Sequence, residues 1–308
     1  MRNLVDECGR GHPEMAPYTE RLRLFLEVLR IRLYQARALR VGPRDLVLDL
    51  GSGSSPNLRA NVLCDKFVSD GTDRLGAPLA HPAERPFIIG DAHSLPFKDH
   101  AFDCVVCSHL LEHVADPARV LAELQRVARR GYIETPSRVA EKMHSLPIHK
   151  WLVGVEGETL VFEAKPAAVI DPELFAWFED QMARNTDFRP LWMKQWQSGL
   201  IAQYWWEDTL PCKVRGEPVA EGLASATCSV AGNEAPPAAG LMARVDSTYG
   251  RWLRRHSQAR AVDLLTLLAC PICHGGLHKD DQNLECAKCQ ARYPYSGTMP
   301  VLLPESRL

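Results

Sequence analysis

The stretch Leu46-Val-Leu-Asp-Leu-Gly-Ser-Gly-Ser-Ser-Pro56 decides the fold of this chain. It begins with a short apolar run, typical of a buried strand, and two glycines follow. Gly51 and Gly53 permit the positive φ angles and the close approach of a ligand that occur at the carboxyl end of a parallel strand. The stretch therefore predicts an α/β sheet with a ligand-binding turn after this strand.

Further apolar runs, bounded by turn residues, predict the other strands of this sheet. They span residues 61–64, 87–90, 102–107 and 132–134. Asp116 and Pro117 suit the N-cap and the first residue of a helix after the 102–107 run. Strands that alternate with helices predict a doubly wound, mostly parallel, Rossmann-like sheet. Residues 51–61 are too few for a crossover helix, so we expect a single turn or an irregular loop there.

Acidic residues follow the second and third predicted strands. Asp65 is placed to accept hydrogen bonds from the two hydroxyls of a ribose, and Asp91 to receive the amino group of an adenine. NAD enzymes also carry an acidic residue after the second strand. However, the third glycine of the dinucleotide fingerprint is absent, and Pro56 stands near its position. The pattern therefore favours an adenosyl cofactor over a dinucleotide.

Two CxxC pairs, separated by a dozen residues, supply four thiolates for one metal ion. The predicted ligands are Cys270, Cys273, Cys286 and Cys289. Four thiolates around a tetrahedral zinc ion leave no coordination position open, which indicates a structural rather than a catalytic metal. A segment this small builds little core, so we expect the metal to supply folding free energy of order 10 kcal/mol.

Taken in order, the motifs between residues 40 and 136 resemble the class I methyltransferases that use S-adenosylmethionine, in the branch similar to quinone-biosynthesis methyltransferases. The shared pattern is strand-D-x-G-x-G, an acidic second strand, D-A-x-x-L-P-F at 91–97, F-D at 102–103 and S-x-x-L-E-H at 108–113. The resemblance implies a complete set of cofactor contacts. These are Asp49, Gly51 and Gly53 for the methionine end, Asp65 for the ribose, Asp91 and Ala92 for the adenine, and Ser108 and His109 beside the donor methyl group.

Methyl transfer to an oxygen or nitrogen acceptor requires a base that removes the acceptor's proton. Ligands of open α/β sheets bind beyond the carboxyl ends of the strands. The predicted strand at 132–134 ends at the same cleft, so the residues that follow it lie near a bound ligand. The candidate bases, in order of preference, are His149, His109, His144 and Glu134. A surface or packing role is the alternative for each histidine. For Glu112 and His113, two roles are about equally supported. They either act in the site, or they only form bonds that hold the loop that closes it.

The cysteine-rich segment resembles the small zinc-ribbon protein that activates tRNA, rRNA and release-factor methyltransferases. The match includes the Tyr293-Pro294 turn and the P-V-L-L tail at 300–303, and it departs from the family at Ser296 and Met299. In that family the ribbon covers an apolar surface of its methyltransferase partner. The resemblance therefore implies a ribbon that packs on its own catalytic domain as a built-in stabiliser, with the tether raising its effective concentration.

The composition limits the partners. The chain has 308 residues, of which 46% are hydrophobic and 24% charged, and a net charge of −2, so no strong basic field favours nucleic acid. Asp6, Glu7 and Arg10 interrupt any signal-peptide core, and no 18-residue apolar run is present. We expect a cytoplasmic protein with no membrane partner.

The acceptor is the open question. Residues 132–163 resemble bacterial methyltransferases that act on small molecules or glycans, so the first hypothesis is methyl transfer to an oxygen or nitrogen atom of such an acceptor. The activator resemblance points instead to RNA or protein, and these stay open as alternatives. A third alternative is a non-catalytic scaffold that only binds the cofactor, although the complete cofactor set argues against it.

We expect five regions along the chain. Residues 151–215 are rich in tryptophan, which predicts a lid over a pocket or a second small core. Within this region we expect a strand at 158–163 and a helix at 172–183. A helix is also expected over 245–268. The regions are an N-terminal helical segment (1–40), the cofactor-binding core (41–150), the aromatic-rich region (151–215), a linker (216–245) and the zinc-ribbon domain (246–308).

Overall fold

The computed structural model describes most of the expected cofactor-binding core and of the ribbon. The described residues are 26, 39–68, 79–80, 85–143, 146, 148–166, 172–185, 197–218, 262–280, 282–295 and 299–306. Most of the expected N-terminal helix, nearly all of the expected linker and the helix expected before residue 262 lie outside this set, as does His144.

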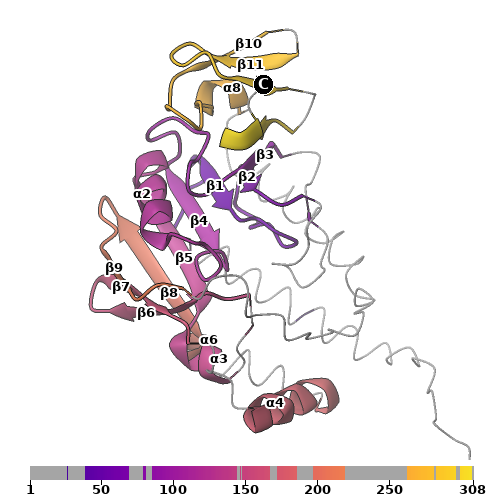
Figure 1. The fold of residues 1–308 in the computed structure, drawn as a ribbon, viewed down its shortest axis with the longest axis vertical. Coiled ribbons are helices and arrows are strands. Elements are labelled where there is room, and N and C mark those ends of the chain that lie inside the picture. The colour runs from indigo at the N-terminus through magenta and orange to yellow at the C-terminus, as the bar shows by residue number, and fades with distance from the viewer. Residues whose placement is uncertain are drawn as a thin grey trace, which may run out of the picture.

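A seven-stranded sheet forms the centre of the molecule, with the strand order β13-β3-β2-β1-β4-β5-β8 (Figure 1). Its strands are β1 (Val47–Leu50), β2 (Val62–Asp65), β3 (Phe87–Gly90), β4 (Cys104–Ser108), β5 (Arg130–Pro136), β8 (Ile201–Glu207) and β13 (Val301–Leu302). All neighbours are parallel except β5 and β8. The five predicted strands are confirmed, with ends within two residues of those expected, and so is the Rossmann-like fold class.

Helix α2 (Pro117–Val127) covers one face of this sheet (Figure 1). The Asp116 side chain accepts a hydrogen bond from Arg119 N–H at 3.0 Å, so it caps the helix as predicted. The helix buries its apolar stripe, which comprises Val120, Leu121, Leu124 and Val127. Residues 51–61 form turns without a helix, which confirms the expected irregular loop.

The aromatic-rich region divides between two sheets. Strands β6 (Trp151–Glu156), β7 (Thr159–Ala164) and β9 (Cys212–Arg215) form a second sheet, whereas β8 joins the central one. Trp151 and Trp206 are buried, but Trp177 on α4 (Pro172–Arg184) is 51% exposed. Trp192 and Trp196 lie outside the described residues. Two short helices, α3 (Arg138–Met143) and α6 (Gln197–Leu200), connect these parts.

The described part of the chain contains no helix with the length and hydropathy of a membrane span.

The ribbon lies at one end of the molecule, in orange and yellow in Figure 1. It consists of α8 (Leu264–Leu267), the antiparallel strands β10 (Leu277–Lys279), β11 (Asn283–Cys286) and β12 (Arg292–Pro294), and η2 (Pro304–Ser306) after β13. Its chain returns to the central sheet, because β13 pairs with β3. Leu268 also bridges to Phe97, and both belong to one hydrophobic core with Leu95, Tyr293 and Leu302. The ribbon therefore packs on the sheet of its own chain.

Candidate functional site

The glycine turn after β1 is held by carboxylates from its own strand and from its neighbour. Gly51 and Gly53 have φ angles of 70° and 53°, in the left-handed region that favours glycine. Gly53 N–H donates to Asp65 Oδ2 at 2.9 Å, and Asn57 N–H donates to Asp49 Oδ2 at 2.6 Å. Asp49 and Asp65 therefore fix the path of the turn across the ends of β1 and β2.

Asp65 and Asp91 lie at the same edge of the sheet. Asp65 ends β2, and Asp91 directly follows the adjacent parallel strand β3. The Asp91 carboxylate accepts hydrogen bonds from His93 N–H at 2.8 Å and from Lys66 Nζ at 2.7 Å. Partial burial raises the pKa of Asp91, but His93 and Lys66 outweigh this effect and leave that pKa well below its usual value. The carboxylate is therefore ionised at neutral pH and able to accept a hydrogen bond.

This edge fits an adenosyl cofactor. The Ser52 hydroxyl is buried in the glycine turn and has no hydrogen-bond partner among the described residues, so it can still bind a polar ligand group. A Cβ atom at Gly51 would lie only 3.1 Å from the Leu110 side chain, which shows how little space the turn leaves for a larger residue. Ala92 and Ser108 lie at the ends of β3 and β4 beside these groups.

His109 sits between two carboxylates at the end of β4. Its Nδ1 lies 3.3 Å from Glu112 Oε1, and its Nε2 lies 3.5 Å from Glu134 Oε1. The backbone is held as well, because His109 N–H donates to the Glu134 carbonyl at 2.8 Å. Desolvation opposes the imidazolium charge, but the two carboxylates outweigh it and raise the pKa of His109 well above its usual value. Since the side chain is 47% exposed, a protonated imidazole faces the solvent here.

Glu134 is buried on β5, and both of its carboxylate oxygens contact polar side chains. Its Oε2 accepts hydrogen bonds from Tyr132 and from Gln203 Nε2, the latter at 3.3 Å. Burial raises the pKa of Glu134, but His109 and Tyr132 outweigh it, and the pKa is lowered. Glu134 therefore stays ionised and fixes the imidazole of His109.

His149, the first candidate base of the sequence analysis, lies in a buried polar cluster. Its Nδ1 contacts Glu141 Oε1, and Glu141 Oε2 lies 3.6 Å from Lys165 Nζ. The His149 side chain is 6% exposed, compared with 47% for His109. The structure thus brings His109 and Glu134 together at the strand ends and places His149 in the interior.

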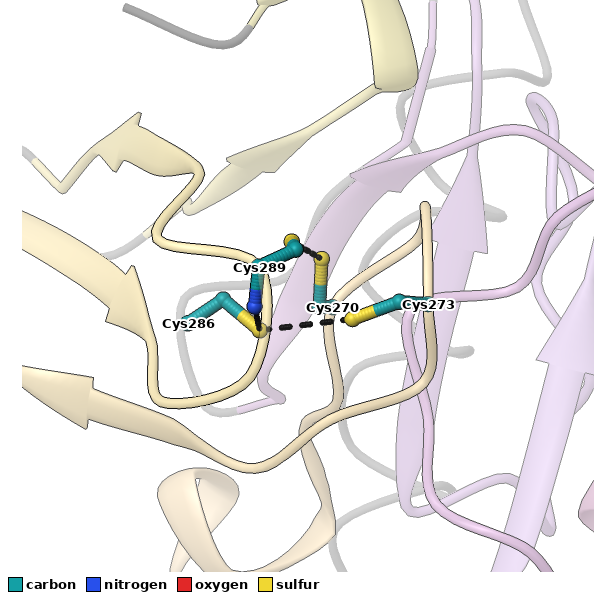
Figure 2. Close-up of side chains that lie close together, drawn as sticks. All are labelled: Cys270, Cys273, Cys286 and Cys289. Atoms are coloured by element: carbon teal, nitrogen blue, oxygen red, sulfur yellow. Dashed lines mark hydrogen bonds between the residues drawn. The ribbon is translucent and has the colours of Figure 1, made fainter.

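The four predicted metal ligands converge in the ribbon, where their sulfur atoms point toward one another (Figure 2). The Sγ atoms of Cys270 and Cys289 are 3.6 Å apart, and those of Cys273 and Cys286 are 3.5 Å apart. Tetrahedral zinc with Zn–S bonds of about 2.3 Å requires S···S separations of about 3.8 Å. The donor set and its spacing therefore fit a structural zinc ion. The hydroxyl of buried Tyr293 lies 3.3 Å from the Cys270 sulfur and orients it.

Sequence reasoning missed several partners of the predicted residues. Lys66 directly follows Asp65, and His93 directly follows Ala92. Their position next to predicted site residues could therefore have identified them. Gln203 gave no such signal, because it reaches Glu134 only through the antiparallel pairing of β8 with β5.

The sequence matches two families of known proteins. Residues 48–133 match the methyltransferase domain family, and residues 262–294 match the Trm112p-like protein family. A demethylmenaquinone methyltransferase of Mycobacterium marinum is 29% identical over 173 residues, which are 54% of this chain and 72% of that protein. An uncharacterized transposon protein of Streptomyces fradiae is 36% identical over 106 residues, or 30% of each chain.

Among solved structures, the complex of the Haloferax volcanii Trm112 methyltransferase activator with a methyltransferase is similar to this chain. The similarity has 25% identity and a TM-score of 0.29, and it covers 37% of this chain and 54% of the other. The similarity thus spans only about half of the matched chain in that complex, and 30% of the Streptomyces protein.

Proposed function

We propose that this chain, which combines a class I methyltransferase domain with a Trm112p-like zinc ribbon, transfers a methyl group from S-adenosylmethionine to a small-molecule or glycan acceptor. The observation that carries the proposal is the position of two carboxylates, Asp65 and Asp91, at the ends of adjacent parallel strands beside the glycine turn. When bound, the cofactor supplies a sulfonium-activated methyl carbon. The chain's task is then to align donor and acceptor.

Each proposed cofactor contact has a chemical reason. Asp65 would accept hydrogen bonds from the ribose hydroxyls, and Asp91 with Ala92 would hold the adenine. Asp49, Gly51 and Gly53 shape the turn that would receive the methionine end. Ser108 and His109 would lie beside the methyl group, since they end the neighbouring strand β4.

His109 is the best-placed group to exchange a proton with the acceptor. It combines half-exposure with two orienting carboxylates, Glu112 and Glu134, whereas His149 is buried. At neutral pH the raised pKa keeps His109 protonated, so it must lose this proton before it can act as a base. A cationic donor nearby would lower that pKa, because like charges disfavour the imidazolium. His144 and Glu134 stay in the set of candidates.

The acceptor proposal draws on charge and on the relatives. The net charge of −2 offers no strong field for nucleic acid, and several similar proteins are named demethylmenaquinone methyltransferases. The match of residues 262–294 to the Trm112p-like family keeps the alternative open, because the ribbon resembles an activator of tRNA, rRNA and release-factor methyltransferases. In either case we propose that the ribbon stabilises the catalytic domain in cis, through β13 and the Leu268–Phe97 contact.

Two measurements test the function. Calorimetry on the zinc-loaded chain should detect S-adenosylmethionine binding, and Asp91→Asn should weaken it. Cell extract incubated with the protein and methyl-labelled cofactor should then yield a labelled product that resists nuclease and protease. Label removed by nuclease or protease would support the RNA or protein alternative. A folded chain that binds the cofactor but labels no acceptor would support the scaffold, and a folded chain without affinity for the cofactor would end the proposal.

A further inference from the structure

A second group of metal-ligating side chains lies next to the proposed catalytic edge, outside the ribbon. It consists of Glu112, His113 and His149, whose donor atoms all lie within 4.8 Å of one another. Glu112 and His113 follow β4 in the same turn as His109, and His149 precedes β6 by two residues. The backbone ties the two segments together, because Lys150 N–H donates to the Glu112 carbonyl at 2.7 Å.

Glu112 is a buried carboxylate with unused acceptor capacity. The residue is 1% exposed, and neither of its carboxylate oxygens makes a hydrogen bond within the described part of the chain. The ion pair at 3.3 Å between Oε1 and His109 Nδ1 compensates one oxygen at most. His109 is protonated and faces Oε1, so the uncompensated atom is Oε2. Burial of a carboxylate oxygen without a hydrogen bond is costly, and a metal ion in contact with Oε2 would offset that cost.

His149 is oriented as metal-ligating histidines are. The hydrogen bond between its Nδ1 and the Glu141 carboxylate places the proton on Nδ1, so the lone pair lies on Nε2. A carboxylate behind the remote nitrogen is the usual outer-shell partner of a histidine ligand, because it fixes the tautomer and raises the basicity of the ligating nitrogen. Glu141 is 1% exposed, and the nearby Lys165 Nζ compensates its charge.

We propose that Glu112, His113 and His149 bind one divalent transition-metal ion, distinct from the zinc of the ribbon. Two imidazoles and one carboxylate suit zinc, iron(II) or cobalt(II) better than magnesium or calcium, which prefer oxygen ligands. Three protein ligands leave at least one coordination position open for water or an acceptor oxygen. The site does not depend on the proposed methyl transfer, because its existence is a question of binding alone.

The competing account is a polar core without metal. The rings of His113 and His149 are 4.6 Å apart and perpendicular, at 87°, which is also a favourable edge-to-face packing. That account explains the histidines and, through the protonated His109, one oxygen of the Glu112 carboxylate. It leaves the buried Glu112 Oε2 without a hydrogen bond in the described part of the chain, whereas a metal ion would bind that oxygen.

Metal content decides between the two accounts. The purified full-length chain is equilibrated with a small excess of zinc, desalted and analysed by elemental mass spectrometry against its amino-acid content. We expect about two zinc ions per chain, one in the ribbon and one in the proposed site. One zinc ion per chain after equilibration overturns the proposal without any variant.

Matched variants then locate the second ion. Glu112→Gln and His149→Ala should each bind about one zinc ion, whereas His100→Asn should retain two. His100 is an exposed control with a positive φ angle that asparagine tolerates. Glu141→Gln should weaken the second ion's affinity about 10- to 100-fold, as is typical of an outer-shell change. Two zinc ions in both Glu112→Gln and His149→Ala would overturn the assignment.

Cobalt(II) provides an independent readout of the donor atoms. Cobalt in the ribbon produces thiolate-to-metal charge-transfer absorption, but cobalt bound by imidazole and carboxylate does not. The second equivalent of cobalt should therefore leave this band unchanged in the wild-type chain. A band that grows in proportion through two equivalents would contradict ligation by nitrogen and oxygen.

Discussion

The proposed cofactor edge, which comprises the strand ends that carry Asp49, Asp65 and Asp91, and the zinc ribbon both gather charged side chains, but they hold them by different means. At the cofactor edge, the sheet positions Asp65 and Asp91, and protein donors such as Gly53 N–H and Lys66 engage their carboxylates. In the ribbon, two local turns gather four sulfur atoms, with two backbone N–H groups on Cys286. The proposed cofactor edge can therefore form before its ligand binds, whereas the ribbon requires its metal to offset the repulsion between thiolates.

The largest expected effect is the loss of the ribbon without zinc. The complete zinc site should supply folding free energy of order 10 kcal/mol, and Cys286→Ser, which removes one of the four ligands, should forfeit a large part of it. Hydrogen exchange should show lost protection in β10–β12, with protection retained in β1, β2 and β4. Cys212→Ser, a half-buried cysteine on β9, provides the control. Protection retained in the ribbon of Cys286→Ser would show that its turns fold without metal.

The second expected effect lies at the contact between the two regions. Leu302 on β13 is fully buried in the shared core, so Leu302→Ala should lower the free energy of unfolding by about 2–4 kcal/mol. Denaturant titration measures this loss. Val214→Ala, at a residue that is 41% exposed, should change it by less than about 0.5 kcal/mol. A similarly small loss for Leu302→Ala would mean that ribbon and sheet are energetically independent.

The third effect concerns ligand affinity alone. Asp91→Asn removes a charged acceptor and should weaken S-adenosylmethionine binding about tenfold to a hundredfold. Because Lys66 and Asp91 form a partly exposed ion pair, the free energy of unfolding should change by about 1 kcal/mol or less. Calorimetry and denaturant titration separate the two quantities. Unchanged cofactor affinity in a folded variant would remove Asp91 from the site.

The smallest expected effect is a shift in the protonation of His109. Glu112 and Glu134 favour the imidazolium, so Glu134→Gln should lower the pKa of His109, by about one unit. An NMR titration of the imidazole should therefore show the proton leaving at lower pH in the variant than in the wild type. Glu217→Gln, at an exposed position, should leave the midpoint unchanged. A midpoint that rises or stays constant in Glu134→Gln would contradict this electrostatic account.

The elements that local sequence patterns predict agree most closely with the structure. The five strands, the capped helix after Asp116 and the four-cysteine cluster follow from apolar runs, cap chemistry and ligand spacing. The aromatic-rich region was expected as a lid or a small core, but β8, which carries Trp205 and Trp206, forms an edge of the central sheet. Edge pairing depends on partners distant in sequence, which periodicity does not reveal.

By itself, the sequence determined which residue types could form a cofactor edge and a metal centre, because glycine turns, strand-end acids and CxxC spacing are local properties. Which of these groups meet depends on how the chain packs. Antiparallel pairing brought Gln203 to Glu134, and the path of the chain after β5 buried His149 beside Glu112 while His109 stayed half-exposed. The physical reason is that hydrogen bonding and charge compensation act across short distances in space, which only the packed chain defines.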